Sequence, residues 1–377
     1  MSEGKTLDEV SDEVVAEDAA KAPKRPGELR QLNRGEWGTK PKPVDALLTL
    51  TRKDRKTVPW LPRGTVALLA SPGGTGKSTL VMQLVLSVAS GVRWLDQFDV
   101  PQAGRVCVWS GEDDEEDMHR RAHAVAYEVR MGAQRGLAAL PEGWEDNVFR
   151  AAVNGEDGRF VNLDDNLAET AFFASVLAQV EELQPALVVL DPASRFMGTE
   201  ENDNAQATRW ITLAEKLKNT TSKPTVLVLV HTGKGKDLDS QEAIRGASAM
   251  VDGARWAATL SRLTRDGEEF DILQLRRVKN NRCPPDEGAV LLERDEFGSV
   301  KFASAAAEAW FAKRLTDLLT SSNVKKREAD DATERALSRA KAEGVNVSEH
   351  FPDAGTGKKA KGKKAAAPEE NDEVPYE

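Results

Sequence analysis

One glycine-rich segment, Ser71-Pro-Gly-Gly-Thr-Gly-Lys-Ser78, carries the clearest chemistry in the sequence. Its glycines allow successive backbone N–H groups to turn inward around phosphate oxygens, and the helix predicted after the segment adds partial positive charge. In such a loop Lys77 reaches the β- and γ-phosphates, and the Ser78 hydroxyl holds Mg²⁺. The first position is Ser71, where the usual pattern has glycine. The segment predicts a nucleotide and Mg²⁺ as ligands, bound by Ser71, Gly73, Gly74, Thr75, Gly76, Lys77, Ser78 and Thr79.

Carboxylates follow two other apolar runs. Asp191 ends the run at 186–190, where it could hold Mg²⁺ through a water molecule, although a carboxylate there could also be only a turn or helix cap. Glu112 follows the run at 105–110 and could orient an attacking water and accept its proton. It also opens six consecutive acidic residues, 112–117, a pattern that favours a solvated helix start. We expect Glu112 to be the catalytic base and its neighbours to have that structural role.

A histidine ends a further apolar run. His231 follows Val226–Val230, where it could touch the γ-phosphate and report its loss to the next loop, which contains Lys234 and Lys236. A histidine at a strand end is often only a neighbour with its hydrogen bonds satisfied. Because several strand ends in turn carry a residue suited to a phosphate site, the sequence favours a sensor role for His231.

The elements that would position these residues alternate along the chain. Apolar runs at 65–70, 105–110, 186–191 and 225–230 indicate buried strands, and amphipathic stretches at 79–89, 167–183 and 205–218 indicate helices between them. Three later runs, at 255–262, 270–278 and 289–293, indicate antiparallel strands joined by hairpins. The prediction is an α/β fold with a mostly parallel sheet flanked by helices, C-terminal antiparallel strands, and ligands at the carboxyl ends of the parallel strands.

Composition limits the remaining classes. The chain has 377 residues and a formal net charge of −10, so a general basic coat for nucleic acid is excluded and any such binding must come from local patches. Its two cysteines exclude a disulfide framework and a cysteine-based metal site, and we expect a reducing, cytoplasmic location. No apolar run reaches the length that spans a bilayer, and the acidic start is unlike a signal peptide, so no membrane partner is expected.

Five blocks of sequence, in this order and spacing, resemble the RepA-type plasmid replicative helicases, a branch of the RecA/DnaB-like ATPases that work as ring hexamers. The resemblance covers about residues 58 to 295. It implies a RecA-like P-loop core, ATP and Mg²⁺ as cofactors, hydrolysis at subunit interfaces, and translocation on one DNA strand. The blocks are Ser71 to Thr79, Gly111-Glu-Asp with His119-Arg-Arg-Ala-His123, Val188 to Asp191 with Ser194-Arg-Phe196, Val230 to Lys234, and Arg245 to Trp256.

The resemblance also assigns roles. It makes Lys77 and Ser78 the phosphate and metal residues, Glu112 the base, Asp191 a metal residue and His231 the phosphate sensor. It implies a basic residue that acts on the neighbouring subunit's γ-phosphate, for which Arg245 matches best and Lys279 and Arg282 are further candidates. Arg276, Arg277, Lys279 and Arg282 could instead form a solvated hairpin rim. DNA would contact the loops at 194–204 and 232–243, the second through Lys234 and Lys236.

The resulting prediction is an ATP-dependent DNA helicase for replication, a homohexamer on single-stranded DNA. A recombination or annealing ATPase that coats single strands, and an ATP-switched loading protein, remain alternatives. We expect a disordered charged tail at 1–43, a linker or subunit-docking arm at 44–57, the ATPase domain at 58–321, and a charged, mostly disordered tail at 322–377. The tails could bind a replication initiator or a single-strand-binding protein.

Overall fold

The chain divides into two compact units, Met1–Pro43 and Val44–Glu377, and the elements below belong to the second. The computed structural model describes residues 38–52, 54–134, 138–162, 165–197, 204–232, 241, 244, 248–264, 267–283, 289–295 and 298–320, and it does not describe the side chains of 133, 134, 248 and 315–320. The tails predicted at 1–43 and 322–377 lie almost wholly outside the described residues, and the predicted domain boundaries stay predictions.

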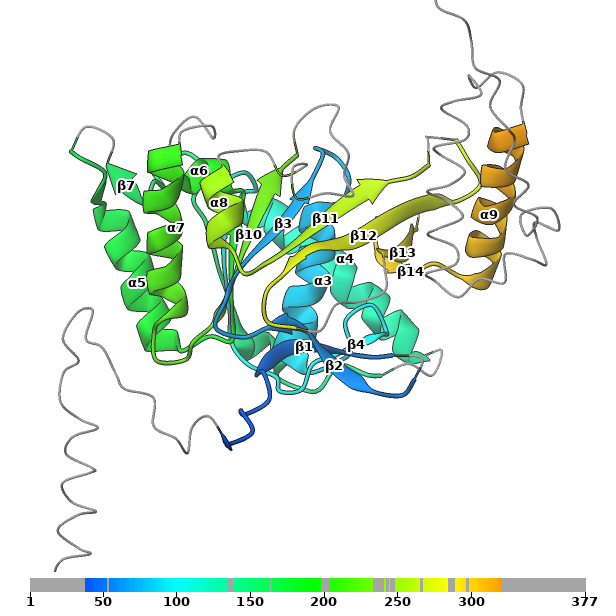
Figure 1. Ribbon diagram of the computed structural model, residues 1–377, viewed down its shortest axis with the longest axis horizontal. Coiled ribbons are helices and arrows are strands. Elements are labelled where there is room, and N and C mark those ends of the chain that lie inside the picture. Colours follow the sequence, from blue (N-terminus) through cyan, green and yellow to red (C-terminus); the bar gives the residue numbers. More distant parts are fainter. Residues whose placement is uncertain are drawn as a thin grey trace, which may run out of the picture. The chain divides into compact units, whose positions relative to one another are not determined.

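A nine-stranded sheet in the order β14-β13-β12-β11-β3-β10-β9-β5-β6 forms the centre of the second unit (Figure 1). Neighbouring strands from β11 to β6 in this order are parallel, and β12, β13 and β14 continue the sheet antiparallel. This confirms the predicted mostly parallel α/β sheet with C-terminal antiparallel strands. The strands are β3 (Val66–Ser71), β5 (Val106–Ser110), β6 (Val148–Ala152), β9 (Leu187–Asp191), β10 (Thr225–His231), β11 (Trp256–Arg262), β12 (Asp271–Asn280), β13 (Ala289–Arg294) and β14 (Val300–Phe302).

Both faces of the parallel strands are buried because successive side chains of a strand point to opposite faces. In β3, Val66, Leu68 and Ala70 face one apolar cluster, and Ala67 and Leu69 face the other. The helices are α3 (Lys77–Ser90), α4 (Glu115–Gln134), η1 (Trp144–Asn147), α5 (Ala171–Leu183), α6 (Ala193–Met197), α7 (Asn204–Lys218), α8 (Ser248–Gly253) and α9 (Ala305–Thr320). The first face is covered by α5, α6, α7 and α8, which lie together in Figure 1. The second face is covered by α3, α4 and a small sheet of β1 (Ala46–Thr51), β2 (Thr57–Pro62) and β4 (Phe98–Asp99).

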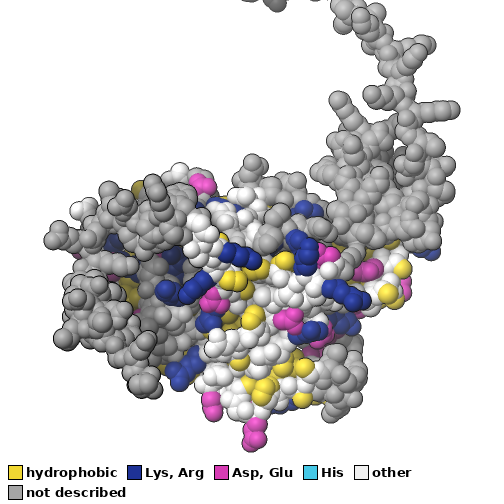
Figure 2. All heavy atoms as spheres, turned by 60° about the horizontal axis from the view of Figure 1, so that its bottom comes forward, with side chains coloured by type: hydrophobic (Ala, Val, Ile, Leu, Met, Phe, Trp, Pro, Cys, Tyr) yellow, Lys and Arg dark blue, Asp and Glu magenta, His cyan; other side chains and the backbone are white. Residues whose placement is uncertain are grey.

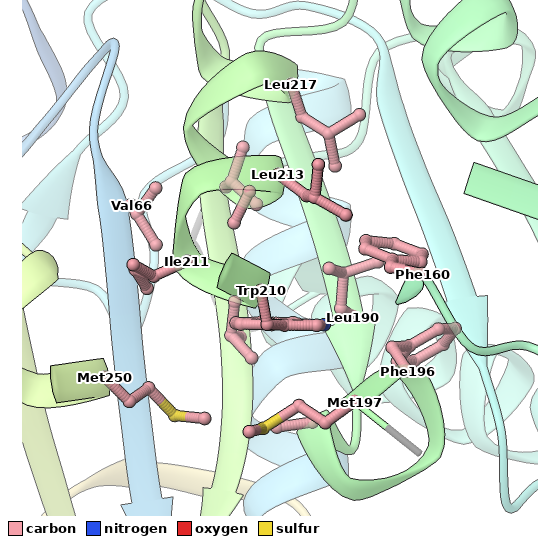
Figure 3. Packing of buried hydrophobic residues seen from close by; sticks show 14 of the residues in the cluster. Val66, Phe160, Leu190, Phe196, Met197, Trp210, Ile211, Leu213, Leu217 and Met250 are labelled. Carbon is pink, nitrogen blue, oxygen red and sulfur yellow. The ribbon is translucent and has the colours of Figure 1, made fainter. Parts of the chain in front are cut away.

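The first cluster is centred on Trp210 of α7, whose side chain is fully buried. Figure 3 shows Trp210 lying among Phe160, Phe196 and Leu190, with Leu213 and Leu217 from later turns of the same helix. The rings of Trp210 and Phe160 stack with centroids 6.1 Å apart. Residues three and four apart on a helix share a face, so one face of α7 is packed onto β3 and β10. This packing fixes the layer that supports the carboxyl ends of those strands.

The segment at 44–57 differs from the prediction of a linker or docking arm. Its residues form β1 (Ala46–Thr51), which pairs with β2 (Thr57–Pro62) and β4 (Phe98–Asp99) in a three-stranded sheet. Leu47 and Leu48 are 2% and 0% exposed in the cluster that also holds α3. These leucines are therefore part of the chain's own core, because their partner strands lie next to them in space. A two-stranded sheet, β7 (Val161–Asn162) with β8 (Ala168–Glu169), completes the strands.

Candidate nucleotide site

The phosphate loop joins β3 to α3. Gly74 (φ 74°) and Gly76 (φ 97°) have left-handed backbone conformations, which glycine adopts without strain. Thr75 Oγ1 donates a hydrogen bond to the Pro72 carbonyl oxygen (2.9 Å), which closes the turn. Lys77 is 7% exposed, and its ammonium donates to the Val230 carbonyl oxygen of β10 (3.2 Å). The lysine is thus held beside the loop at the carboxyl ends of β3 and β10.

Strand register brings the other predicted residues to the same edge. His231 is paired with Ser71, and Asp191 with Ser110, the residue two before Glu112. The Gly111 amide donates to the Asp191 carbonyl oxygen (2.8 Å), which ties the turn before Glu112 to the end of β9. The strands β3, β10, β9 and β5 are neighbours in the sheet. The structure therefore places Lys77, Ser78, Asp191, Glu112 and His231 along one edge, while their chemical roles stay predictions.

Asp191 and Ser78 form the donor set that fits Mg²⁺. The Ser78 hydroxyl lies near the Asp191 carboxylate. Burial raises the pKa of Asp191, and the carboxylates of Asp113 and Glu112 raise it further, against the opposing effects of Ser78 and Lys77. Ionised Asp191 is thus penalised without a cation. A hydroxyl and one carboxylate suit Mg²⁺, which completes its coordination with water and phosphate oxygens, and the described residues contain no cluster of three or more His, Cys, Asp or Glu suited to a metal.

The six acidic residues at 112–117 differ in the contacts that they make. Glu112 is exposed, and within the described part of the chain it has no hydrogen-bond or ion-pair partner. Each of the next five acids has a hydrogen-bond or ion-pair partner, which lies in α4 for four of them and in β6 for Glu115. Asp113 binds Arg121, Asp114 caps the Asp117 amide (2.7 Å), Glu115 accepts from the Ala152 amide (3.1 Å), and Glu116 and Asp117 bind Arg120 (2.8 and 2.7 Å).

Two arginines at the site were missed as site residues from the sequence. Arg195 of α6 lies against Gly111 so closely that a Cβ built there would be 2.5 Å from Arg195 Cγ. Arg294, at the end of β13, donates from Nη1 to the Thr75 carbonyl oxygen of the phosphate loop (3.4 Å). Arg195 stands in the block Ser194-Arg-Phe196, whereas nothing local to Arg294 signals its position, because its partner lies 219 residues away in the sequence.

The remaining candidates divide into two groups. Lys234, Lys236 and Arg245 lie outside the described residues. Lys279 and Arg282 lie at the opposite edge of the sheet from the phosphate loop, since β12 runs antiparallel to β11 and β3. Lys279 Nζ donates to the carbonyl oxygens of residues 251 and 252 (2.8 and 3.2 Å), and Arg282 Nη1 to that of residue 64 (2.9 Å). Arg276 and Arg277, suggested as part of a solvated rim, are half-buried instead.

Basic residues gather at this opposite edge. We use the name basic edge for Lys218, Arg255, Lys279 and Arg282. Burial lowers the pKa of Lys218, and Arg282 and Arg255 lower it further against the opposing effect of Glu215. Burial also lowers the pKa of Lys279, and Arg255 adds to this effect against the pull of Asp252. Figure 2 brings this side of the fold forward and shows Lys and Arg side chains spread over it, with Asp and Glu side chains between them.

The fold and the strand-edge cluster define a P-loop nucleoside triphosphatase with a RecA-like sheet. A family model described as AAA domain matches residues 39–237, and the chain belongs to this family of P-loop ATPases. Two solved structures are similar. The ATPase domain of the G40 protein is 15% identical, with 80% of this chain and 100% of that chain covered (TM-score 0.49). A KaiC-like protein from Pyrococcus horikoshii OT3 is 14% identical, with 70% and 99% covered (TM-score 0.46). In the described residues, no helix is both long and apolar enough to cross a membrane.

Proposed function

We propose that this ATPase is a DNA motor, a replicative helicase that assembles as a homohexameric ring and moves on single-stranded DNA. One observation carries the proposal. The Thr232 amide donates to the Ser71 carbonyl oxygen (3.1 Å), and Thr232 pairs with Ile244 in an isolated bridge. The loop between them contains Lys234 and Lys236. Both ends of this loop, Thr232 and Ile244, are therefore anchored beside His231 and Ser71, the first residue of the phosphate loop.

This anchoring supports a link between the phosphates and the loop. A change at the γ-phosphate that moves His231 or Ser71 would act on both ends of the loop, because Thr232 follows the histidine and is bonded to the serine. Lys234 and Lys236 on this loop would contact the DNA backbone. Six subunits would place these lysines around a central strand, and their binding should weaken steeply with salt.

The hydrolytic chemistry follows from the strand-edge cluster. Lys77 would neutralise charge on the β- and γ-phosphates, and the exposed carboxylate of Glu112 would orient a water and accept its proton. Ser78 and Asp191 would hold Mg²⁺. When bound, this ion would supply positive charge that offsets the negative charge of the phosphates. Glu112 suits the base role because, among the described residues, no partner engages its carboxylate.

Placement of the basic edge supports assembly. The phosphate loop and the basic edge lie at opposite ends of the same parallel strands. Contact between unlike ends of neighbouring subunits is heterologous, and it closes into a ring when the rotation between subunits permits. Lys279 or Arg282 would then supply the cation in trans, an effect worth about 10³ to 10⁵ in rate. Arg245, which lies outside the described residues, stays the other candidate for this role.

Displacement of a labelled strand from a forked duplex tests the proposal, together with negative-stain images of the protein with an ATP analogue and single-stranded DNA. We expect ATP-dependent displacement and closed six-fold rings. The Lys234→Ala, Lys236→Ala double variant should lose the DNA-stimulated part of ATP turnover and retain the DNA-free part. Open filaments without displacement would favour the strand-coating ATPase. Turnover that DNA leaves unchanged would favour the ATP-switched loading protein, and either result would overturn the proposal.

A further inference from the structure

We propose that Arg294 is a positioning residue of the nucleotide site, which orients the phosphate loop from the same chain and is itself held by Asp271. Arg294 ends β13, three strands away from β3 in the sheet order. Its Nη1 donates to the Thr75 carbonyl oxygen (3.4 Å) and would lie 3.4 Å from a Cβ built on Gly76. The side chain thus reaches from the antiparallel part of the sheet, β12 to β14, which we call the extension, to the outer side of the loop. The inference rests on ATP binding at this loop and is independent of any action on DNA.

Asp271 fixes the orientation of this arginine. Its Oδ2 accepts from Arg294 Nε (2.7 Å) and Nη2 (2.6 Å), and its Oδ1 accepts from Arg262 Nε (2.6 Å) and Thr264 Oγ1 (3.3 Å). The side chains of Arg294 and Asp271 are only 18% and 22% exposed, so the pair is partly shielded from solvent. Burial raises the pKa of Asp271, but hydrogen bonds from Arg262 and Arg294 more than offset this and leave the pKa below its usual value. The carboxylate is therefore ionised at neutral pH.

The contact with Thr75 has a direct consequence for phosphate binding. The Thr75 carbonyl and the Gly76 N–H belong to one peptide group, which is planar and trans, so the two bonds point in opposite directions. A guanidinium that holds the carbonyl on the outer side of the loop therefore directs the Gly76 N–H to the inner side. That N–H is one of the donors that a phosphate loop turns toward the phosphates. The left-handed conformation of Gly76 (φ 97°) is compatible with this orientation and would strain other residues.

A second bond ties the helix after the loop to the same extension. Gln83 Nε2, on α3, donates to the Val300 carbonyl oxygen of β14 (2.8 Å). The loop is thus attached through Arg294 at the start of α3, and the helix through Gln83 about two turns later. Strands β13 and β14 thus contact both the phosphate loop and α3, which restricts their movement relative to α3. The bond from Arg294 therefore holds the loop in a fixed position. Arg294 should therefore preorganise the empty loop, and its loss should weaken nucleotide binding more than it slows the chemical step.

Binding of fluorescent mant-ADP and steady-state ATP turnover by the full chain test this inference. Arg294→Met keeps an unbranched apolar stem but removes the guanidinium, with its charge and hydrogen bonds. We expect its Kd for mant-ADP and KM for ATP to rise about 10-fold, about 1.4 kcal/mol, with kcat changed less than about 3-fold. The matched control is Arg314→Met. Arg314 also pairs with a carboxylate just before the extension, that of Glu268 (2.7 Å), at 20% exposure, but no contact joins it to the described loop residues. Its nucleotide binding should stay within about 2-fold of the parent protein.

Asp271→Asn provides the second arm, because it leaves Arg294 in place and weakens the carboxylate that binds it, together with the bonds from Arg262 and Thr264. It should raise Kd in the same direction, and Arg294→Met with Asp271→Asn should bind no worse than Arg294→Met alone, as expected for residues that act as a unit. If Arg294→Met fails to fold, Asp271→Asn and Arg294→Lys carry the test. Binding by these variants equal to that of Arg314→Met, or additive losses in the double variant, would overturn the inference. Lys77→Ala reports separately on the site, since unchanged binding in that variant would remove the nucleotide site itself.

Discussion

Substitution of Gly111 by alanine is a sharp test of how the site is built. The new Cβ would lie 2.5 Å from Arg195 Cγ and 2.6 Å from Arg195 Cβ, whereas ordinary contacts are 3.4 Å or longer. One side must therefore retreat by about 0.9 Å, and overpacking of this kind costs about 1–3 kcal/mol. Arg195 Cβ is fixed by the backbone of α6, so the turn that carries Glu112 is expected to absorb much of the shift. Misplacement of a reacting group by about 1 Å costs about 100-fold in rate.

Steady-state ATP turnover measures the effect. Gly111→Ala should lower kcat about 100-fold and change KM little, because the phosphate loop is not displaced. Gly158→Ala is the matched control, since its Cβ would meet the backbone and side chain of the same helix at 3.7 Å, an ordinary distance. Its kcat should stay within about 2-fold of the parent protein.

Rescue separates a steric cause from other causes. Arg195→Gly removes both close contacts, so it should restore turnover in the Gly111→Ala background to the level of Arg195→Gly alone. Arg195→Ala retains the Cβ at 2.6 Å and should restore little. Normal kcat in Gly111→Ala, or equal losses in both backgrounds, would refute the reasoning that the close approach of Gly111 and Arg195 positions Glu112.

Four further outcomes are expected. Lys77→Ala should abolish ATP turnover through loss of binding, whereas Glu112→Gln should lower kcat by about 10² to 10⁴ and keep mant-ADP affinity; a Glu112→Gln enzyme with normal kcat would remove the base assignment. Burial raises the pKa of Asp191, and Mg²⁺ binds the ionised carboxylate, so binding of Mg²⁺-nucleotide should release a proton and become tighter as pH rises through that pKa. Calorimetry in two buffers measures this proton release, which should be absent in Asp191→Asn. Thr170→Ala, which removes the cap of α5, should lower the free energy of unfolding by about 1 kcal/mol in a urea titration, and an unchanged midpoint would contradict the cap's contribution. Arg245→Ala should bind ATP, lose turnover and inhibit mixed assemblies, and mixed assemblies with activity proportional to their parent subunits would exclude a role in trans.

Much of the sheet could be predicted because its central strands are continuous apolar runs. β3, β5, β9, β10 and β11 begin and end within one or two residues of the predicted runs. Their carboxyl ends meet at one edge in a parallel sheet, so residues at those ends could be assigned to one site before any contact was known. The prediction therefore depended on element order and on residue type at each strand end.

Contacts between distant parts of the chain could not be predicted in this way. Leu47 and Leu48 stand in a short apolar stretch followed by charged residues, and only pairing of β1 with β2 and β4 shows that they are buried. The sequence around Arg294 does not distinguish it from a surface arginine, because its contact with the phosphate loop forms only in the folded chain. The close approach at Gly111 depends on the path of α6, which no local pattern encodes.

ATP turnover of the full chain, measured with and without single-stranded DNA at low and at moderate salt, tests the central claim most directly. We expect DNA to increase turnover, the increase to shrink as salt rises, and Lys77→Ala to remove turnover in every condition. Turnover that DNA does not change, or turnover that persists in Lys77→Ala, would contradict a DNA motor driven from the phosphate loop of β3 and α3.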